Sequence, residues 1–122
     1  MSRIDYNALA FDNDPNNRLL AAENGYGLDI LVHDPLPEIR IAVAMQDYGL
    51  CVLVNDTEPA VRIAVVRQRY GLETLMNDRS SKVRTAVAEQ GFGLDTLIND
   101  ECPEVREAAE EALRKLNKKG GN

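Results

Sequence analysis

The chain has 122 residues, a formal net charge of −6, two cysteines and no tryptophan, and 44% of its residues are hydrophobic. This apolar fraction is that of an ordinary globular domain, which excludes a disordered chain, and two cysteines are too few for a disulfide scaffold. The acidic balance argues against nonspecific binding to DNA or to an anionic membrane surface. No apolar run is long enough for a signal peptide or a membrane span, so we expect a cytoplasmic protein.

A motif of 22 residues repeats along almost the whole chain, which we treat as one domain over residues 1–122. Segments that begin with Gly-Leu at residues 27, 49, 71 and 93 align with one another, and a degenerate first copy begins at Asp5. Three positions never vary: a Leu, an Asp three residues later, and an Arg six residues after the Asp. Regular self-similarity of this length is typical of stacked structural units. The units are residues 5–26, 27–48, 49–70, 71–92 and 93–114.

Each unit is predicted to contain a short helix followed by a longer one. In the third unit, Leu50, Leu53 and Val54 have helical spacing over barely two turns, which predicts a short α- or 3₁₀-helix. Pro59 then occupies a position suited to the first turn of a second helix, whose side chains at i, i+3, i+4 and i+7 form one buried stripe. We expect this helix to end at the aromatic residue that closes the unit, with the next glycine in the left-handed conformation. The closing aromatic residues are Tyr26, Tyr48, Tyr70 and Phe92.

A pair of short helices cannot bury its apolar face alone, so neighbouring units must stack. The predicted fold is therefore all-α, an α-α superhelix (solenoid) of five helix-turn-helix repeats. In the fifth unit the exposed positions become glutamates, and its second helix is expected to run on to Lys118 and Lys119. Cations at a helix C-terminus are favourable, so we predict a polar C-terminal cap over residues 93–119.

The pattern Leu-x-x-Leu-x-x-Asp-x-x-Pro-x-Val-Arg-x-Ala-Val-Ala, present across residues 28–44 with Ile39 in place of Val, resembles the bacterial variant leucine-rich repeat and, more broadly, HEAT repeats. In HEAT repeats the Asp and the Arg form a hydrogen-bonded ladder between adjacent units. The resemblance therefore implies a structural ladder whose pairs cross the unit boundaries. Its residues would be Asp12, Arg18, Asp34, Arg40, Asp56, Arg62, Asp78, Arg84, Asp100 and Arg106.

Binding specificity is expected at positions that vary between units. The residue two after the first buried residue of the second helix lies on the opposite side, since two steps of about 100° give about 200°. That position reads Leu, Ile, Ile, Thr and Glu along the chain. We predict that this apolar row binds a protein partner, or a second copy in a homodimer, without enzymatic activity. Alternatively, a tight superhelix or the N-terminal segment covers the row. The predicted contact residues are Leu19, Ile41, Met45, Ile63, Val66 and Arg67.

Two other functions stay open as alternatives. The units carry formal charges of −3, −3, +1, 0 and −5 in chain order, so the middle of the chain is locally basic and could contact nucleic acid. Against this, the aromatic side chains that a single-strand binder would use occupy structural positions. The acidic ends could instead imitate the charge of nucleic acid and inhibit an enzyme. The central basic patch would consist of Arg67, Arg69, Arg79 and Lys82.

Nothing in the sequence favours catalysis. The single histidine, His33, replaces the Asn found at this position in later units, and no catalytic triad can be assigned around it. Cys51 and Cys102 stand at different repeat positions two units apart, too far in a solenoid to bond or to share a metal ion. The Gly-aromatic-Gly segments lack the third glycine and the preceding strand of a phosphate loop. We expect no cofactor, no metal and no small-molecule substrate.

Overall fold

The computed structural model describes residues 3–120, and within this range the chain forms ten α-helices and no β-strand. Each unit contributes a helix of four residues and a longer one. The short helices are α1 (Tyr6–Leu9), α3 (Leu28–Leu31), α5 (Leu50–Leu53), α7 (Leu72–Leu75) and α9 (Leu94–Leu97). The long helices are α2 (Pro15–Glu23), α4 (Pro37–Met45), α6 (Pro59–Arg67), α8 (Ser81–Glu89) and α10 (Pro103–Gly120). The predicted all-α fold class is confirmed.

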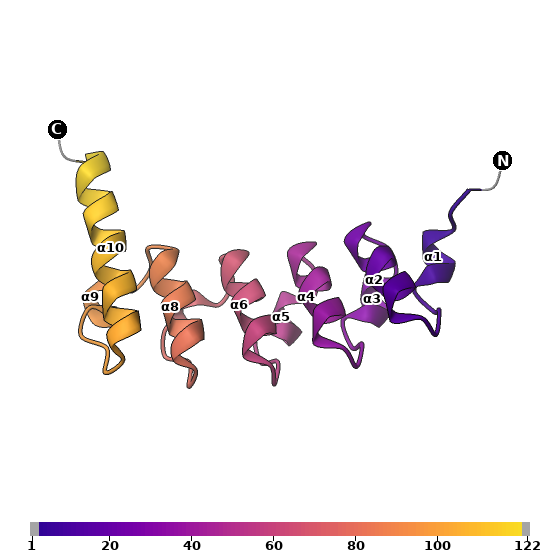
Figure 1. The fold of residues 1–122 in the computed structure, drawn as a ribbon, viewed down its shortest axis with the longest axis horizontal. Coiled ribbons are helices and arrows are strands. Elements are labelled where there is room, and N and C mark those ends of the chain that lie inside the picture. The colour runs from indigo at the N-terminus through magenta and orange to yellow at the C-terminus, as the bar shows by residue number, and fades with distance from the viewer. Residues whose placement is uncertain (1–2, 121–122) are drawn as a thin grey trace.

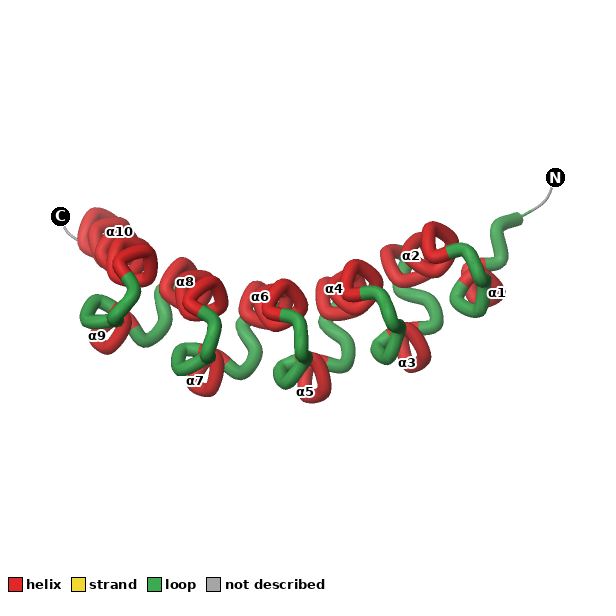
Figure 2. The backbone as a smooth tube through the Cα atoms, turned by 60° about the horizontal axis from the view of Figure 1, so that its bottom comes forward, coloured by secondary structure: helices red, strands yellow, loops and turns green. Residues whose placement is uncertain are grey.

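The helices form two rows that follow an arc (Figures 1 and 2). The long helices lie side by side, each packed against the long helix of the next unit, and they line the inner side of the arc. The short helices form the outer row, and each packs against the long helices of its own unit and of the preceding one. Since each unit contacts its neighbours alone, the structure is a stack of helix pairs, as predicted. We call the inner surface of the long helices the concave face.

The invariant Asp precedes every long helix, and a proline begins four of the five. Four of the five long helices begin at the expected proline, whose missing N–H would have no partner in the first turn. The invariant carboxylate accepts an N–H from the turn two residues later: Leu36 N–H donates to Asp34 Oδ1 at 3.0 Å, and Cys102 N–H donates to Asp100 Oδ1 at 2.9 Å. This bond closes the turn between the short and the long helix of a unit.

The long helices end earlier than the sequence suggests. Helix α2 stops at Glu23, three residues before Tyr26, so the prediction that the aromatic residue ends the helix is wrong. The left-handed residue that terminates α2 is Gly25 (φ +81°), and its N–H donates to Ala22 O while Tyr26 N–H donates to Ala21 O. Asp47 and Arg69 take the same conformation (φ +59°) in the next two units. In two of the three interior units the left-handed residue is therefore not a glycine, so the sequence gives no signal for the true helix end.

The glycine after each aromatic residue is left-handed, as expected, but it begins the next short helix instead of ending the long one. Gly49 has φ +66°, and a Cβ there would lie 2.6 Å from Val32 Cγ2 of the preceding unit. At Gly71 the corresponding distance to Val54 Cγ2 is 2.8 Å. Both the dihedral angle and the close approach between units therefore require glycine at this position.

The core is continuous through the stack and changes at the two terminal units. The invariant Leu of each short helix from α3 to α9 is about 1% exposed, and the buried stripe of the long helices packs over it. Asn17 replaces the buried Val61 of the third unit, and the exposed Glu110 replaces the buried Ala88 of the fourth. The expected extension of the last helix is confirmed, since α10 runs to Gly120 with Lys118 and Lys119 in its final turn. Over residues 3–120, no helix has the length and apolar character needed to cross a membrane.

Candidate functional site

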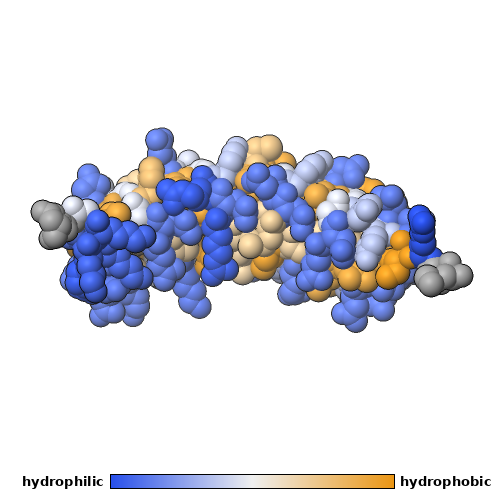
Figure 3. Space-filling model, turned by 90° about the horizontal axis from the view of Figure 1, so that it is seen from above, coloured by the Kyte–Doolittle hydropathy of each residue, from blue (hydrophilic) through white to orange (hydrophobic). Residues whose placement is uncertain are grey.

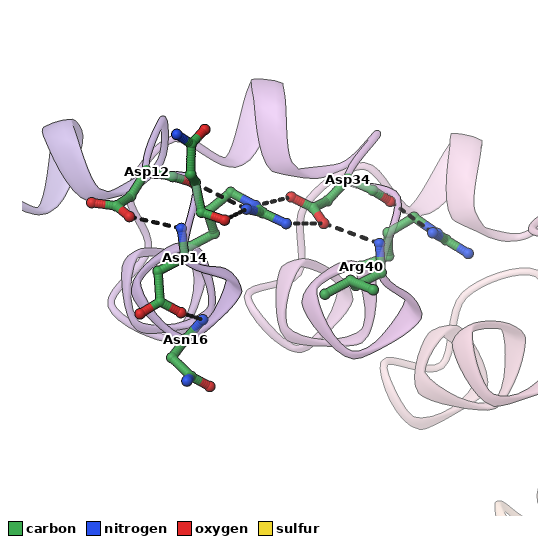
Figure 4. Close-up of polar contacts among 8 residues, drawn as sticks. Asp12, Asp14, Asn16, Asp34 and Arg40 are labelled. Atoms are coloured by element: carbon green, nitrogen blue, oxygen red, sulfur yellow. Dashed lines mark hydrogen bonds and ion pairs between the residues drawn. The ribbon is translucent and has the colours of Figure 1, made fainter.

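The invariant Asp and Arg residues form ion pairs that cross four successive unit boundaries. In each pair the Arg Nε of one unit lies 2.7–2.8 Å from a carboxylate oxygen of the next unit, and a second guanidinium nitrogen donates to the other oxygen. Figure 4 shows the N-terminal part of this ladder around Asp34 and Arg40. The ladder that the resemblance implied is present. Its pairs are Arg18–Asp34, Arg40–Asp56, Arg62–Asp78 and Arg84–Asp100.

The ladder groups are satisfied within the fold. Arg40 Nη1 also donates to the main-chain oxygen of Asp34 in its own unit at 2.7 Å, and Arg62 Nη1 donates to Asp56 O at 2.6 Å. Every buried side-chain nitrogen or oxygen in residues 3–120 has a hydrogen-bond partner. At the C-terminal end, Arg106 keeps its bond to Asp100 O (2.6 Å). Because the charges of these four ion pairs are already compensated, the pairs hold neighbouring units together and offer a ligand no free charge.

The pKa values of the ladder follow from these bonds. For Asp78, burial alone would raise the pKa, but the hydrogen bonds from Arg62 and from Ser80 N–H together lower it. For Asp100, the hydrogen bond from Arg84 is the largest cause and lowers the pKa against the effect of burial. The same bond raises the pKa of Arg84. The charged forms of Asp78, Asp100 and Arg84 are therefore favoured in the folded chain.

The predicted apolar row lies on the concave face, where three of its members line one groove. Leu19 of α2 and Ile41 of α4 are half-buried, and Met45 is 49% exposed. Between α2 and α4 the surface is hollowed by about 440 Å³. We call this hollow the α2–α4 groove; it is lined by Leu19, Glu23, Glu38, Ile41, Ala42, Met45 and Gln46.

Of the other predicted contact residues, Ile63 and Arg67 reach the surface and Val66 does not. Ile63 is half-buried one helix further along the row, and Arg67 is exposed in the last turn of α6. Val66 is 0% exposed, so its assignment to the partner-binding surface is wrong. Its position faces the next unit, where α8 packs against α6. The row itself is half-buried rather than fully exposed, because neighbouring long helices about 8–10 Å apart cover its flanks.

The concave row changes character along the stack. The apolar Leu19, Ile41 and Ile63 are followed at the same repeat position by the half-buried Thr85 and the exposed Glu107. Figure 3 looks onto the edge where the long helices end. Hydrophobic surface shows in the middle and towards the N-terminal end, while hydrophilic side chains cover the C-terminal end. The groove therefore belongs to the N-terminal half of the molecule.

The predicted basic patch is divided between the two ends of the long helices. Arg67 and Arg69 lie at the C-terminal end of α6, whereas Arg79 and Lys82 lie at the N-terminal end of α8. Parallel nine-residue helices separate these two pairs by roughly 13 Å along the helix axis. Arg69 is moreover engaged with the next unit, since its Nη1 donates to Gln90 O at 2.9 Å and to Gln90 Oε1 at 3.0 Å.

A second apolar strip, on the outer row, was missed by the sequence reasoning. Phe11 is 70% exposed, and Ile30 and Val52 are also exposed on α3 and α5. Hollows of about 520 and 390 Å³ lie beside this strip, and ladder residues line both of them. The signal was available, because the fourth residue of each unit reads Ala, Ile, Val, Thr and Thr along the chain.

The residues weighed for catalysis or metal binding do not form a site. His33 is exposed in the turn after α3. Cys51 is exposed on α5, Cys102 precedes α10, and both are free thiols. Within residues 3–120, no three His, Cys, Asp or Glu side chains are grouped so that they could hold a metal ion.

Comparison of the chain with protein-family models, with curated proteins and with solved structures gives no match. Within residues 3–120 the fold is an all-helical repeat.

Proposed function

We propose that the chain is a non-enzymatic protein-interaction module of HEAT-like repeats, similar in pattern to the variant leucine-rich repeat, that holds a segment of a partner protein on its concave face. The observation that carries the proposal is the α2–α4 groove. Its floor is apolar, and Leu19, Ile41 and Met45 stand at positions that vary between units, while the Leu, Asp and Arg of the repeat are constant. Exposed apolar surface of this kind is typical of protein contacts.

The energetics indicate how much of the row a partner must use. Each Leu- or Met-sized side chain buried in the groove contributes about 1.5–3 kcal/mol before the cost of association. A micromolar complex requires about −8 kcal/mol. The groove alone is therefore too small, and a partner segment must continue along the row to Ile63. The rigid helices preorganise this surface, and the flexible Met45 side chain lets it adapt to different partner side chains.

Nucleic-acid binding has less support as a second function. The two pairs of cations stand at opposite ends of the long helices, and one member, Arg69, is bonded to Gln90. The concave row ends at exposed glutamates of α10, which would repel phosphates.

The experiment uses substitutions that other units already contain. In the double variant Ile41→Thr with Met45→Glu, Thr reproduces Thr85 and Glu reproduces Glu23 and Glu89 at the equivalent positions. The fold should tolerate both, at a cost of about 1 kcal/mol, because Ile41 is half-buried. The matched control is Val52→Thr on the outer strip, which reproduces Thr74.

Peptides would be selected from a displayed library on the immobilised wild-type chain and measured by fluorescence anisotropy. We expect at least tenfold weaker binding to the groove variant, about 1.4 kcal/mol, and unchanged binding to Val52→Thr. Circular dichroism confirms that both variants are folded. The groove would be refuted as the site if the peptides bound both variants as tightly as the wild type. It would also be refuted if they lost affinity only for the control Val52→Thr.

A further inference from the structure

The rim of the α2–α4 groove carries charge of one sign. Glu23 of α2 and Glu38 of α4 both line the hollow, and both are exposed. Neither carboxylate forms an ion pair or a side-chain hydrogen bond within residues 3–120. The lining of the hollow contains no Lys, Arg or His, so these two charges are not compensated locally.

From this complementarity we propose, resting on the proposed function, that the partner is a protein segment with several apolar side chains flanked by Lys or Arg. The apolar side chains enter between Leu19, Ile41 and Met45, and the cations meet Glu23 and Glu38 at the rim. An acidic segment would place like charges beside the two carboxylates, which costs affinity. The first two units each carry a formal charge of −3, so the surrounding field also attracts a cationic segment.

The charge of the concave face further restricts where the basic side chains of this segment lie. Beyond the groove, the exposed Arg67 of α6 and Lys82 of α8 stand on the same side of the long helices. They disfavour cations over the third and fourth units. The segment therefore has its Lys or Arg residues over α2 and α4, and neutral or acidic residues where it passes Arg67.

A second copy of the chain also offers an apolar side chain flanked by cations, but this contact is too small to hold a dimer together. The end of α10 projects beyond the other long helices and exposes Leu116 (52%) beside Lys115, Lys118 and Lys119 (Figure 1). One leucine contributes about 1.5–3 kcal/mol, and each exposed ion pair adds about 0.2–1 kcal/mol. The sum of these free energies is too small for a stable dimer. We therefore expect the segment to come from another protein.

The test uses two fluorescein-labelled peptides with the same stripe of leucines. One has Lys beside the stripe, and its twin has Glu at every Lys position. They are titrated against the wild type and against two variants with the same change in charge. The groove variant is Glu23→Gln with Glu38→Gln. The control is Asp29→Asn with Glu73→Gln, which removes two exposed carboxylates from the short helices.

We expect the basic peptide to bind more tightly than its acidic twin at about 50 mM salt, and the difference to shrink at about 300 mM. Neutralising the rim should weaken the basic peptide about threefold to tenfold, and the control should change it less than twofold. The inference would be overturned if the two peptides bound the wild type with equal affinity or if neither bound. It would also be overturned if the basic peptide lost the same affinity for both charge variants. Tighter binding of a labelled single-stranded DNA, or a groove-dependent dimer in light scattering, would overturn it as well.

These outcomes separate the two proposals. If both peptides bind the wild type equally and neither binds the double variant Ile41→Thr with Met45→Glu, the groove is the site and the proposed charge preference is wrong. If the groove variant binds selected peptides like the wild type, the proposed function itself fails.

Discussion

The long helices carry both the arginines of the Asp–Arg ladder and the concave row, but the ladder is constant along the chain and the row is variable. The ladder keeps the same two residue types in all five units and the same 2.7–2.8 Å contacts at four boundaries. The row changes from Leu19 to Glu107, although a long helix presents it in every unit. The ladder sets the stacking of the units, and under the proposed function the row varies with the partner.

The largest effect is expected where the ladder is most buried. Arg62 is 2% exposed and its partner Asp78 has a 7% exposed side chain. Arg62→Ala leaves that carboxylate buried without its partner, so the free energy of unfolding should fall by about 3–5 kcal/mol. The control is Arg106→Ala, which removes a single bond to Asp100 O and should cost about 1 kcal/mol. Urea unfolding followed by circular dichroism measures both, and equal losses would contradict a structural role that depends on the ion pair.

Sequence periodicity predicts the parts of this structure that repeat, and it fails where neighbouring units decide the outcome. The two helices of each unit and the proline starts follow from local spacing, and the ladder follows from a resemblance in which all five units agree. A helical wheel of α6 identifies the side opposite its buried stripe, but it gives no sign that α8 covers part of that helix. Val66 was therefore predicted to be exposed, although it is buried. The groove exists because Leu19 and Ile41 come from different units, and their separation depends on the curvature of the stack.

A smaller loss is expected at the glycines that join the units. In Gly71→Ala the new Cβ would lie 2.8 Å from Val54 Cγ2, and the alanine would have to keep φ near +66°. For both reasons the free energy of unfolding should fall by about 2–4 kcal/mol. Gly91→Ala is the matched control, since Gly91 has φ +77° but no atom within 4 Å of the new Cβ. It should cost about 1–2 kcal/mol from the dihedral angle alone. Equal melting temperatures of the two variants would show that close stacking does not matter at Gly71.

Acid should weaken the ladder. Because the folded pKa of Asp78 and of Asp100 lies below the ordinary Asp value, their contribution to stability is complete above that value, about 3.9, and declines as the pH falls through the lower folded pKa. Asp100→Asn removes one of these titrations. The variant should be less stable than the wild type near neutral pH, and the gap should narrow as the pH falls below 4. A gap that is constant from pH 7 to pH 3 would contradict the assignment.

The smallest expected effect is a gain in stability at the end of α4, where a non-glycine residue takes the left-handed conformation. Asp47 holds the left-handed conformation (φ +59°) at the position where the first and fourth units have Gly25 and Gly91. Its side chain forms no hydrogen bond within residues 3–120. Asp47→Gly should therefore raise the free energy of unfolding by about 0.5–1 kcal/mol, since the steric cost of the left-handed region exceeds the added entropy of the unfolded chain.

Arg69→Gly makes the same backbone change with a different result. Gly relieves the same dihedral cost, but the bonds from Arg69 Nη1 to Gln90 O (2.9 Å) and Gln90 Oε1 (3.0 Å) are lost. These bonds join the third unit to the fourth on the edge opposite the ladder, and a net contribution of about 0.5–1.5 kcal/mol cancels the gain. Thermal melts of the two variants therefore report whether a variable residue can take part in stacking. If Arg69→Gly is stabilised as much as Asp47→Gly, the ladder and the core hold this boundary without it, and Arg69 is as free to vary as the concave row.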